Sequence, residues 1–216
     1  MQLAPEKVYA PPKPKPVYEF FKRFFDIVLS LFALIVLSPL FLVIAILIKC
    51  EDKGPVFFKQ TRLTKGCREF KMYKFRSMCV DAEAKLASLM DRNEVNGPAF
   101  KIEDDPRITK IGRFIRKTSI DELPQLLNIL KGEMTIIGPR PPLPREVAEY
   151  TEYQKHRLDV KTGLSCYHEC SGRSKVTDFD QWVEQDLQYI RERSLWVDFK
   201  VILMTVKVVL TGDGAM

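Results

Sequence analysis

The sequence is poor in histidine and has no regular cysteine pattern. His156 and His168 are its two histidines, and its five cysteines form no C-x-x-C pair. An odd, irregularly spaced set of cysteines predicts reduced thiols in a cytosol-facing compartment and excludes a disulfide framework. Cys166 and Cys170 flank His168, but structural zinc sites use four such ligands, so a zinc site is not favoured.

Charged residues are missing from Ile27 to Ile48. About 22 residues at about 1.5 Å each give roughly 33 Å, enough to cross a hydrocarbon core of about 30 Å, so a transmembrane helix is the simplest prediction. A signal peptide fits less well, because the run is too long and no small-residue cleavage site follows it.

Two features favour a broken helix that enters and leaves the membrane by the same face. Ser38-Pro39 interrupts the run, and proline removes a helical hydrogen bond and kinks a helix. Lysine and arginine also lie on both sides of the run, although a simple span carries its excess on the cytoplasmic side. These residues are Lys13, Lys15, Lys22 and Arg23 before the run, and Lys49, Lys53, Lys59, Arg62, Lys65 and Arg68 after it. A kinked span stays open as the alternative.

The chain divides into three parts, with enough residues for one buried domain. Residues 1–17 hold five prolines among lysines and predict a flexible tail. Residues 18–49 form the membrane segment, and residues 50–216 the domain. We expect two strands around a Lys65-Gly66 turn in 55–78, a basic helix in 108–119, a rigid proline-rich loop in 136–146 and a helix in 147–158. Residues 194–212 predict an apolar helix, either in the membrane interface or in a buried core.

SIDELPQLLNILKG, residues 119–132, predicts a helix with a start and a stop. Ser119 and Glu122 match an S-x-x-E capping box, the leucines have helical spacing, and Gly132 suits the C-terminal end. Asp121 and Glu122 then have two interpretations. They complement the positive end of the helix, or they are the working groups of an enzyme.

Basic residues surround these acids, and the chain has a net charge of +6 and a pI near 9.0. Such a charge favours an acidic partner: nucleic acid, anionic lipid or a phosphorylated substrate. Arg140 lies between two prolines and Arg173 follows a glycine, so both are held by the backbone. Guanidinium groups bind phosphate bidentately, so the set suits a diphosphate, with a solvated surface as the plain alternative.

Two adjacent carboxylates beside such arginines have a coherent chemistry. One would hold Mg²⁺ together with substrate phosphate, and the other would attack phosphorus without needing a base. Because the attacking group and its target are both anions, cations must surround them. The spacing of Asp121 and Glu122 alone does not establish this chemistry.

Several motifs in order resemble the monotopic phosphoglycosyl transferases, bacterial enzymes that load a sugar phosphate onto a polyprenyl phosphate. The resemblance runs from about Phe20 to the C-terminus. It rests on FKRFFDIVLS…SPLFLVIAILIK, VFFKQTRLTKGCREFKMYKFRSM, DPRITKIGRFIRKTSIDELPQLLNILKGEMTIIGPRPPLPRE and VKTGL…SGRS. The implied fold is α/β-mixed and mostly helical: a re-entrant membrane hairpin kinked at Ser38 and Pro39, a catalytic domain with a small β-hairpin, and interfacial amphipathic helices.

The resemblance implies a two-step reaction. Asp121 would attack the β-phosphorus of a UDP-sugar and release UMP, and undecaprenyl phosphate would then take the sugar phosphate from Asp121. Glu122 would bind Mg²⁺ together with Asp121. It would also help to position the reacting groups or to remove a proton. Arg116, Arg140 and Arg173 match the phosphate-contacting arginines, with Lys74 and Arg76 as weaker candidates.

The resemblance also implies surroundings. The expected location is the bacterial cytoplasmic membrane, with the site on its cytoplasmic face. The expected partners are membrane lipid, the glycosyltransferases that act next in exopolysaccharide, O-antigen or glycoprotein glycan assembly, and a second copy of the chain in a homodimer. Nucleic acid is not an expected partner. We expect the catalytic core without the extra multi-span domain of many relatives. Thr162 replaces a usual proline, and His168-Glu169-Cys170 replaces a usual Trp-Gln-Val. The motif versions weakly favour a hexose over an N-acetylated sugar.

Two other functions compete with this one. A non-enzymatic, membrane-anchored basic module binding anionic lipid or nucleic acid would explain the charge and the apolar run, but would not need Asp121. A polymer-forming glycosyltransferase would use the nucleotide-sugar directly and release UDP instead of UMP.

Overall fold

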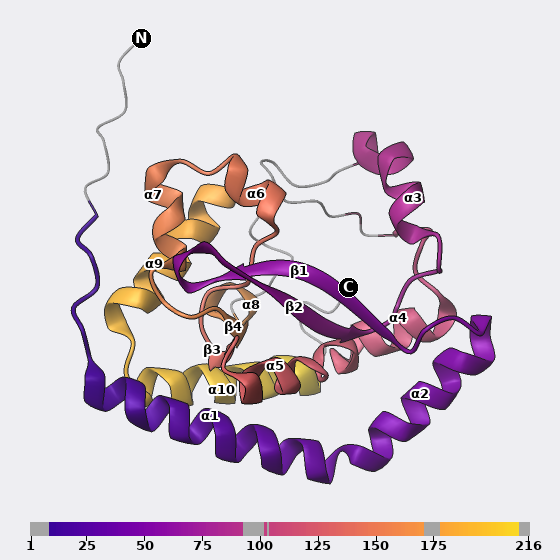
Figure 1. Ribbon diagram of the computed structural model, residues 1–216, viewed down its shortest axis with the longest axis horizontal. Coiled ribbons are helices and arrows are strands. Elements are labelled where there is room, and N and C mark those ends of the chain that lie inside the picture. Colours follow the sequence, from indigo (N-terminus) through magenta and orange to yellow (C-terminus); the bar gives the residue numbers. More distant parts are fainter. Residues whose placement is uncertain (1–8, 93–101, 103, 171–177, 212–216) are drawn as a thin grey trace.

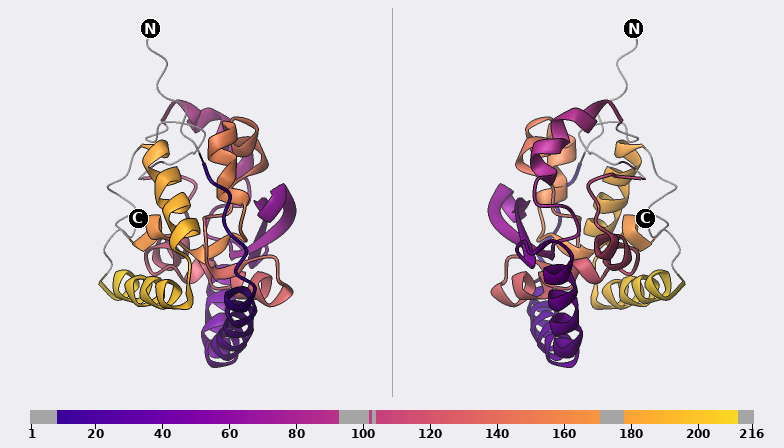
Figure 2. Two further views of the ribbon diagram at one scale, coloured as in Figure 1. Left: turned by 90° about the vertical axis from the view of Figure 1, so that its left-hand side faces the viewer. Right: turned by 90° about the vertical axis from the view of Figure 1, so that its right-hand side faces the viewer.

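The computed structural model describes residues 9–92, 102, 104–170 and 178–211, and it is mostly helical, as predicted. Two long helices, α1 (Pro16–Val36) and α2 (Ser38–Asp52), form a bent pair along one end of the molecule (Figure 1). The last helix, α10 (Leu195–Thr211), lies at the same end when the molecule is turned by 90° (Figure 2). The other elements are stacked above this base.

The bend between α1 and α2 has a local cause. The two helices are inclined by 61° at a break at Leu37. Pro39 has no N–H to donate to the carbonyl of Ile35, four residues back. The hydroxyl of Ser38 donates a hydrogen bond of 2.8 Å to that carbonyl instead. The predicted break at Ser38-Pro39 is therefore confirmed.

The base of the molecule exposes many apolar side chains. Among the described residues no single helix is long and apolar enough to cross a bilayer, whereas the bent α1–α2 pair meets the requirement by length and composition. In α10, Val201 is buried but Trp196 and Leu203 are exposed, so this helix is not a fully buried core helix. The exposed apolar residues of the pair include Phe20, Phe24, Phe32, Ile35, Leu42, Val43 and Ile46.

A β-hairpin packs against helices of the base and of the rest of the domain. Strands β1 (Phe57–Thr64) and β2 (Arg68–Phe75) are antiparallel and are joined by the short helix η1 (Lys65–Cys67), as predicted. Phe70 and Met72 pack against α5 (Gln125–Lys131), whereas Phe75 packs against α2 and α4 (Lys110–Lys117). Strand β2 thus packs against α2 and against α4 and α5, the helices on either side of Asp121.

The remaining elements are short. Strand β3 (Thr135–Ile137) pairs in parallel with β4 (Gly163–Ser165), a pairing that we did not predict. The single helix predicted for 147–158 is wrong, because it is broken near Thr151, whose side chain accepts a hydrogen bond from the Gln154 N–H and so starts a new helix. The elements not yet named are α3 (Ala82–Leu86), η2 (Ala87–Arg92), η3 (Ile120–Glu122), α6 (Pro144–Ala148), α7 (Glu152–Lys155), η4 (His156–Leu158), α8 (Tyr167–Cys170) and α9 (Phe179–Glu192).

The predicted capping box at Ser119 is wrong. Ser119 has a left-handed backbone with φ 55°, and its side chain makes no cap hydrogen bond. Its N–H instead donates to the carbonyl of Arg116 and closes the end of α4. The acids lie in η3, and α5 starts only after Pro124, so the motif is two short helices. Gly132, with φ 80°, ends α5 as predicted.

Polar contacts join the first and last parts of the described chain. Lys22 on α1 forms a 2.8 Å ion pair with Asp198 on α10. The ammonium group of Lys15 donates to the carbonyl of Arg193, whose guanidinium donates in turn to the carbonyl of Lys13. Residues 9–15, which the sequence assigns to a flexible tail, therefore lie against the domain, and residues 1–8 lie outside the described residues.

Candidate functional site

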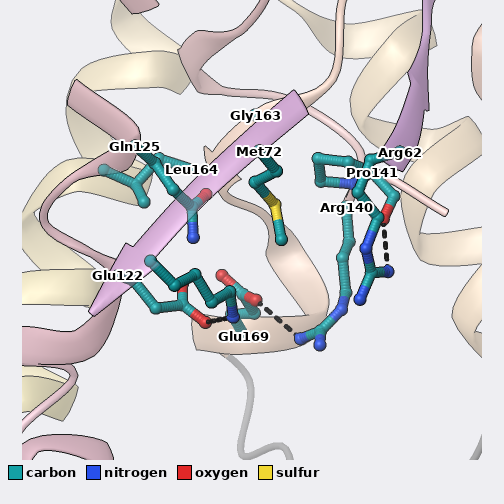
Figure 3. Close-up of a pocket in the computed structure, with 10 residues that line it drawn as sticks. Arg62, Met72, Glu122, Gln125, Arg140, Pro141, Gly163, Leu164 and Glu169 are labelled. Carbon is teal, nitrogen blue, oxygen red and sulfur yellow. Dashed lines mark hydrogen bonds and ion pairs between the residues drawn. The ribbon is translucent and has the colours of Figure 1, made fainter. Parts of the chain in front are cut away.

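A small pocket lies where the β-hairpin meets the loop after β3 and the start of β4 (Figure 3). Gly163 permits the close approach of β4 to the loop after β3, because a Cβ atom there would lie 2.1 Å from the backbone nitrogen of Gly138. Three cations and two carboxylates are among the residues lining the pocket: Arg62, Met72, Lys74, Glu122, Gln125, Arg140, Pro141, Gly163, Leu164 and Glu169.

One pair of charges joins strand β2 to η3. The Lys74 ammonium lies 2.9 Å from Oε1 of Glu122, and both side chains are mostly buried. Asp121, the neighbour of Glu122 in the chain, is 7% exposed. The fold therefore brings Glu122 together with Lys74, one of the two weaker cation candidates, and Asp121 precedes Glu122 in the chain without being among the pocket-lining residues.

A second pair involves the predicted Arg140. Its guanidinium lies 3.2 Å from the carboxylate of Glu169, which is nearly buried on α8 (Figure 3). Arg140 also lies over the ring of Trp182, 5.9 Å from its centroid. Both partners belong to the pocket lining, so Glu169 fixes a predicted phosphate-binding arginine at the pocket.

Behind this pair lies a fully buried ion pair. Arg157 donates to Asp186 at 2.7 Å and to the Tyr150 hydroxyl at 2.9 Å. Burial raises the pKa of Asp186 to about 6, the charge of Glu169 adds to that rise, and Arg157 opposes it. Arg157 thereby joins α9 to the segment around Tyr150, and neither Arg157 nor Asp186 lines the pocket.

Sequence analysis missed Arg62 as a site residue and treated it only as part of the flanking charge. Its guanidinium donates to the carbonyl of Pro141 at 2.9 Å (Figure 3). It also donates to the side-chain oxygen of Gln60 at 3.0 and 2.7 Å. Burial, followed by repulsion from Arg140, lowers the pKa of Arg62 to about 10. The alternating pattern of β1 could have indicated which face of the hairpin carries Arg62, but not that this face lines a pocket.

Other predicted cations lie elsewhere. Arg76 is buried, pairs with Asp52 at the end of α2 and donates to the carbonyl of Pro55, so the structure places it outside the pocket lining. Arg116 is half-buried on α4 and lies near Asp105. Arg173 lies outside the described residues. The structure thus brings Lys74, Glu122 and Arg140 to one pocket, and leaves Arg76 in a structural contact.

The two departures from the expected motifs have structural settings. Thr162 is fully buried, and its N–H and hydroxyl both contact the hydroxyl oxygen of Thr64, at 3.4 and 3.1 Å. A proline could not donate from its nitrogen. His168 stacks on Trp182 at 4.4 Å between centroids, and Cys170 packs into the core. Glu169 alone of these three lines the pocket.

The donor set beside the pocket suits Mg²⁺ only with help from a substrate. Within residues 9–92, 102, 104–170 and 178–211, no three His, Cys, Asp or Glu side chains converge to hold a metal. Mg²⁺ in phosphoryl-transfer sites is held by one or two carboxylates together with substrate phosphates. Asp121 and Glu122 supply that number of carboxylates.

The arrangement is suited to an anionic substrate. Cations from β1, β2 and the loop after β3 surround a space beside two adjacent carboxylates. The two ion pairs hold Lys74 and Arg140 in place before any ligand binds, which reduces the cost of ordering them. A phosphate-containing molecule would meet preorganised positive charge here.

Comparisons with known proteins agree with this chemistry. The profile of the bacterial sugar transferase family matches residues 17–212. The chain is 50% identical over 194 residues to galactosyl transferase CpsE of Streptococcus agalactiae serotype III, covering 90% of this chain and 43% of that protein. It is 40% identical over 200 residues to undecaprenyl-phosphate galactose phosphotransferase of Salmonella typhimurium, covering 91% and 42%.

A shorter relative matches over most of its length. Exopolysaccharide production protein ExoY of Sinorhizobium fredii is 36% identical over 205 residues, covering 93% of this chain and 90% of that protein. The chain spans less than half the length of the two longer relatives. Because the family profile covers nearly the whole chain, the protein belongs to the bacterial sugar transferase family.

Proposed function

We propose that the protein transfers a sugar 1-phosphate from a UDP-sugar to undecaprenyl phosphate and releases UMP. The observation that carries this proposal is the adjacent Asp121–Glu122 pair beside a pocket lined by Arg62, Lys74 and Arg140. The relatives' names support it, since they include an undecaprenyl-phosphate galactose phosphotransferase and a UDP-glucose:undecaprenyl-phosphate glucose-1-phosphate transferase.

In the first step, a carboxylate oxygen of Asp121 attacks the β-phosphorus of the UDP-sugar. A bond forms between that oxygen and phosphorus, and the bond from phosphorus to the bridging oxygen breaks. UMP leaves with the bonding electron pair, and the sugar phosphate stays on Asp121 as an acyl-phosphate. No base is required, because the carboxylate is already ionised.

In the second step, a phosphate oxygen of undecaprenyl phosphate attacks the same phosphorus. The acyl-phosphate bond breaks, the Asp121 carboxylate is restored, and a polyprenyl diphosphosugar results. Lys74 holds Glu122 in position, and Glu169 holds Arg140 where the phosphates bind. Asp121 and Glu122 together would hold Mg²⁺, which supplies charge neutralisation for the diphosphate.

The lipid acceptor calls for a membrane-bound site. We propose that α1 and α2 form a re-entrant hairpin, with α10 in the interface and the pocket on the cytoplasmic face. The exposed apolar side chains of all three helices at one end of the molecule support this placement. A glycosyltransferase acting on the product and a homodimer stay predictions, as does a hexose in preference to an N-acetylated sugar.

The test is release of UMP from a panel of UDP-sugars by the detergent-solubilised protein with Mg²⁺ and undecaprenyl phosphate. We expect UMP with at least one common UDP-sugar, and at least a ~1,000-fold loss in Asp121→Asn, because nucleophile removal commonly costs that much. Asp104→Asn, on an exposed loop carboxylate, is the control.

Three outcomes would contradict the proposal. Release of UDP would indicate the polymer-forming alternative. Equal activity in Asp121→Asn would remove the covalent step. No turnover with any UDP-sugar, together with lipid binding, would restore the non-enzymatic module, which the family assignment does not favour.

A further inference from the structure

The three pocket cations differ in how their charges are balanced. Lys74 is paired with Glu122 at 2.9 Å, and Arg140 is paired with Glu169 at 3.2 Å. Arg62 contacts neutral acceptors, the Pro141 carbonyl and the Gln60 amide oxygen, and forms no ion pair among the described residues. One positive charge of the pocket lining is therefore left without a direct counter-charge.

Arg62 is not held away from the pocket. Its three hydrogen bonds occupy three of the five N–H donors of a guanidinium, so two donors remain. They belong to its two terminal nitrogens, which can present a fork to one phosphate. The contacts to Gln60 and Pro141 fix the plane of the group, and Figure 3 shows Arg62 on the same side of the pocket as Arg140.

The electrostatic surroundings of Arg62 favour an anion. Withdrawal from water lowers its pKa first, and Arg140 lowers it further. The charges of Glu146 and Glu122 oppose that shift, but Glu146 already accepts from the Leu143 N–H and Glu122 from Lys74. Bound phosphate would relieve the repulsion between the two arginines and replace the hydration that Arg62 has lost.

We infer that the two remaining donors of Arg62 bind a phosphate group of the substrate. Arg140 would contact the same phosphate group. This inference rests on the proposed function for the identity of the ligand. Two sources share the chemistry: the diphosphate of the nucleotide-sugar and the phosphate of the lipid acceptor. Lys74 and Arg140 are already paired with carboxylates, so Arg62 adds a positive charge that no described carboxylate pairs with directly.

The test measures binding without turnover, on the full chain in detergent. Calorimetric titrations with UDP and, separately, with farnesyl phosphate would compare wild type, Arg62→Gln and Arg62→Lys. We expect ~10- to 100-fold weaker binding of at least one probe to Arg62→Gln, with Arg62→Lys in between, because a charge-assisted bond is lost. Arg68→Gln, on an exposed arginine of the same hairpin, is the matched control and should bind as wild type does.

Each outcome has a meaning. A loss for UDP alone assigns the nucleotide diphosphate, a loss for farnesyl phosphate alone assigns the lipid phosphate, and unchanged binding of both probes overturns the inference. If Arg62→Gln does not fold, arginine modification of wild type by phenylglyoxal replaces it. UDP or farnesyl phosphate should then protect Arg62 at least ~10-fold, and absence of protection by either overturns the inference. UMP release is assayed separately, so failure of the proposed reaction is distinguishable.

Discussion

The hydroxyl of Ser38 donates a 2.8 Å hydrogen bond to the carbonyl oxygen of Ile35. In an unbroken helix that carbonyl would receive the N–H of the residue four positions later, which here is Pro39. Ser38 therefore supplies the donor that its neighbour lacks. The pair makes a bend whose freed carbonyl still has a partner in a very apolar segment, where an unpaired polar group is costly.

Ser38→Ala should lower stability by about 1 kcal/mol, because it leaves the Ile35 carbonyl without that donor. The unfolding midpoint in detergent would measure the loss. Ser30→Ala is the matched control on α1, since the buried Ser30 hydroxyl has no hydrogen-bond partner in the described part of the chain. Equal effects of the two substitutions would show that the Ser38 bond contributes nothing.

A re-entrant path predicts that both ends of the α1–α2 pair lie on the cytoplasmic side. The exposed native Cys50 marks one end, and Ala10→Cys, also exposed, marks the other. In a background with Cys67 and Cys79 replaced by serine, we expect a membrane-impermeant maleimide to label both only in inverted vesicles. Labelling of position 10 from the outer side of intact cells would instead show a true span.

The buried pair Arg157–Asp186 should show strong coupling in stability. Arg157→Met and Asp186→Asn each leave a charge or a polar group buried without its partner, so each should cost roughly 3–5 kcal/mol. Arg157→Met with Asp186→Asn should cost much less than the sum of the two single changes. Denaturant unfolding of the four proteins measures this.

An exposed pair provides the comparison for that cycle. Glu152→Gln removes the surface ion pair with Lys155 and should change stability by less than about 1 kcal/mol. Additive losses at Arg157 and Asp186 would argue against a tightly coupled pair.

The pair Asp105–Arg107 should make stability depend on pH. The hydrogen bond from Arg107 lowers the pKa of Asp105 below its ordinary 3.8. The stabilisation is therefore complete above about pH 4 and is lost as the pH falls through the lower, folded-state pKa. We expect wild type to exceed Asp105→Asn by roughly 1–3 kcal/mol near pH 6, with a shrinking difference below pH 4.

Asp104→Asn is the control for this pH series, because the Asp104 carboxylate is almost fully exposed. It should run parallel to wild type from pH 3 to pH 7. A constant difference between wild type and Asp105→Asn across that range would contradict the assignment.

The sequence predicted elements whose signals are local. Proline, serine and uninterrupted apolar residues indicated the break at Ser38-Pro39, and alternation around Lys65-Gly66 indicated the hairpin. The predicted capping box does not form, because Ser119 closes the preceding helix α4 instead of starting a new helix. The carbonyl of Arg116 takes the N–H of Ser119, which forces a left-handed backbone where an N-cap needs an extended one.

The candidate site was only partly predictable because tertiary contacts assemble it. Lys74 and Arg140 were predicted as phosphate-binding cations, but only one of their two carboxylate partners was a predicted site residue. Glu122 was part of the predicted motif, whereas Glu169 is 29 residues from Arg140 and meets it through the parallel pairing of β3 and β4. Arg62 lies on β1, and Arg76 directly follows β2. Only their contacts with distant segments show that Arg62 lines the pocket and that Arg76 forms a structural ion pair.

The ion pair between Lys22 and Asp198 joins two segments that the ribosome makes at different times. At about 5–20 residues per second, a ribosome makes Asp198 roughly 10–35 s after Lys22. Throughout that interval, α1 and α2 exist without α10, the helix whose Asp198 pairs with Lys22 on α1. Early contact of this nascent segment with lipid would shield its phenylalanines from other chains, and the late arrival of α10 would then close the base of the domain.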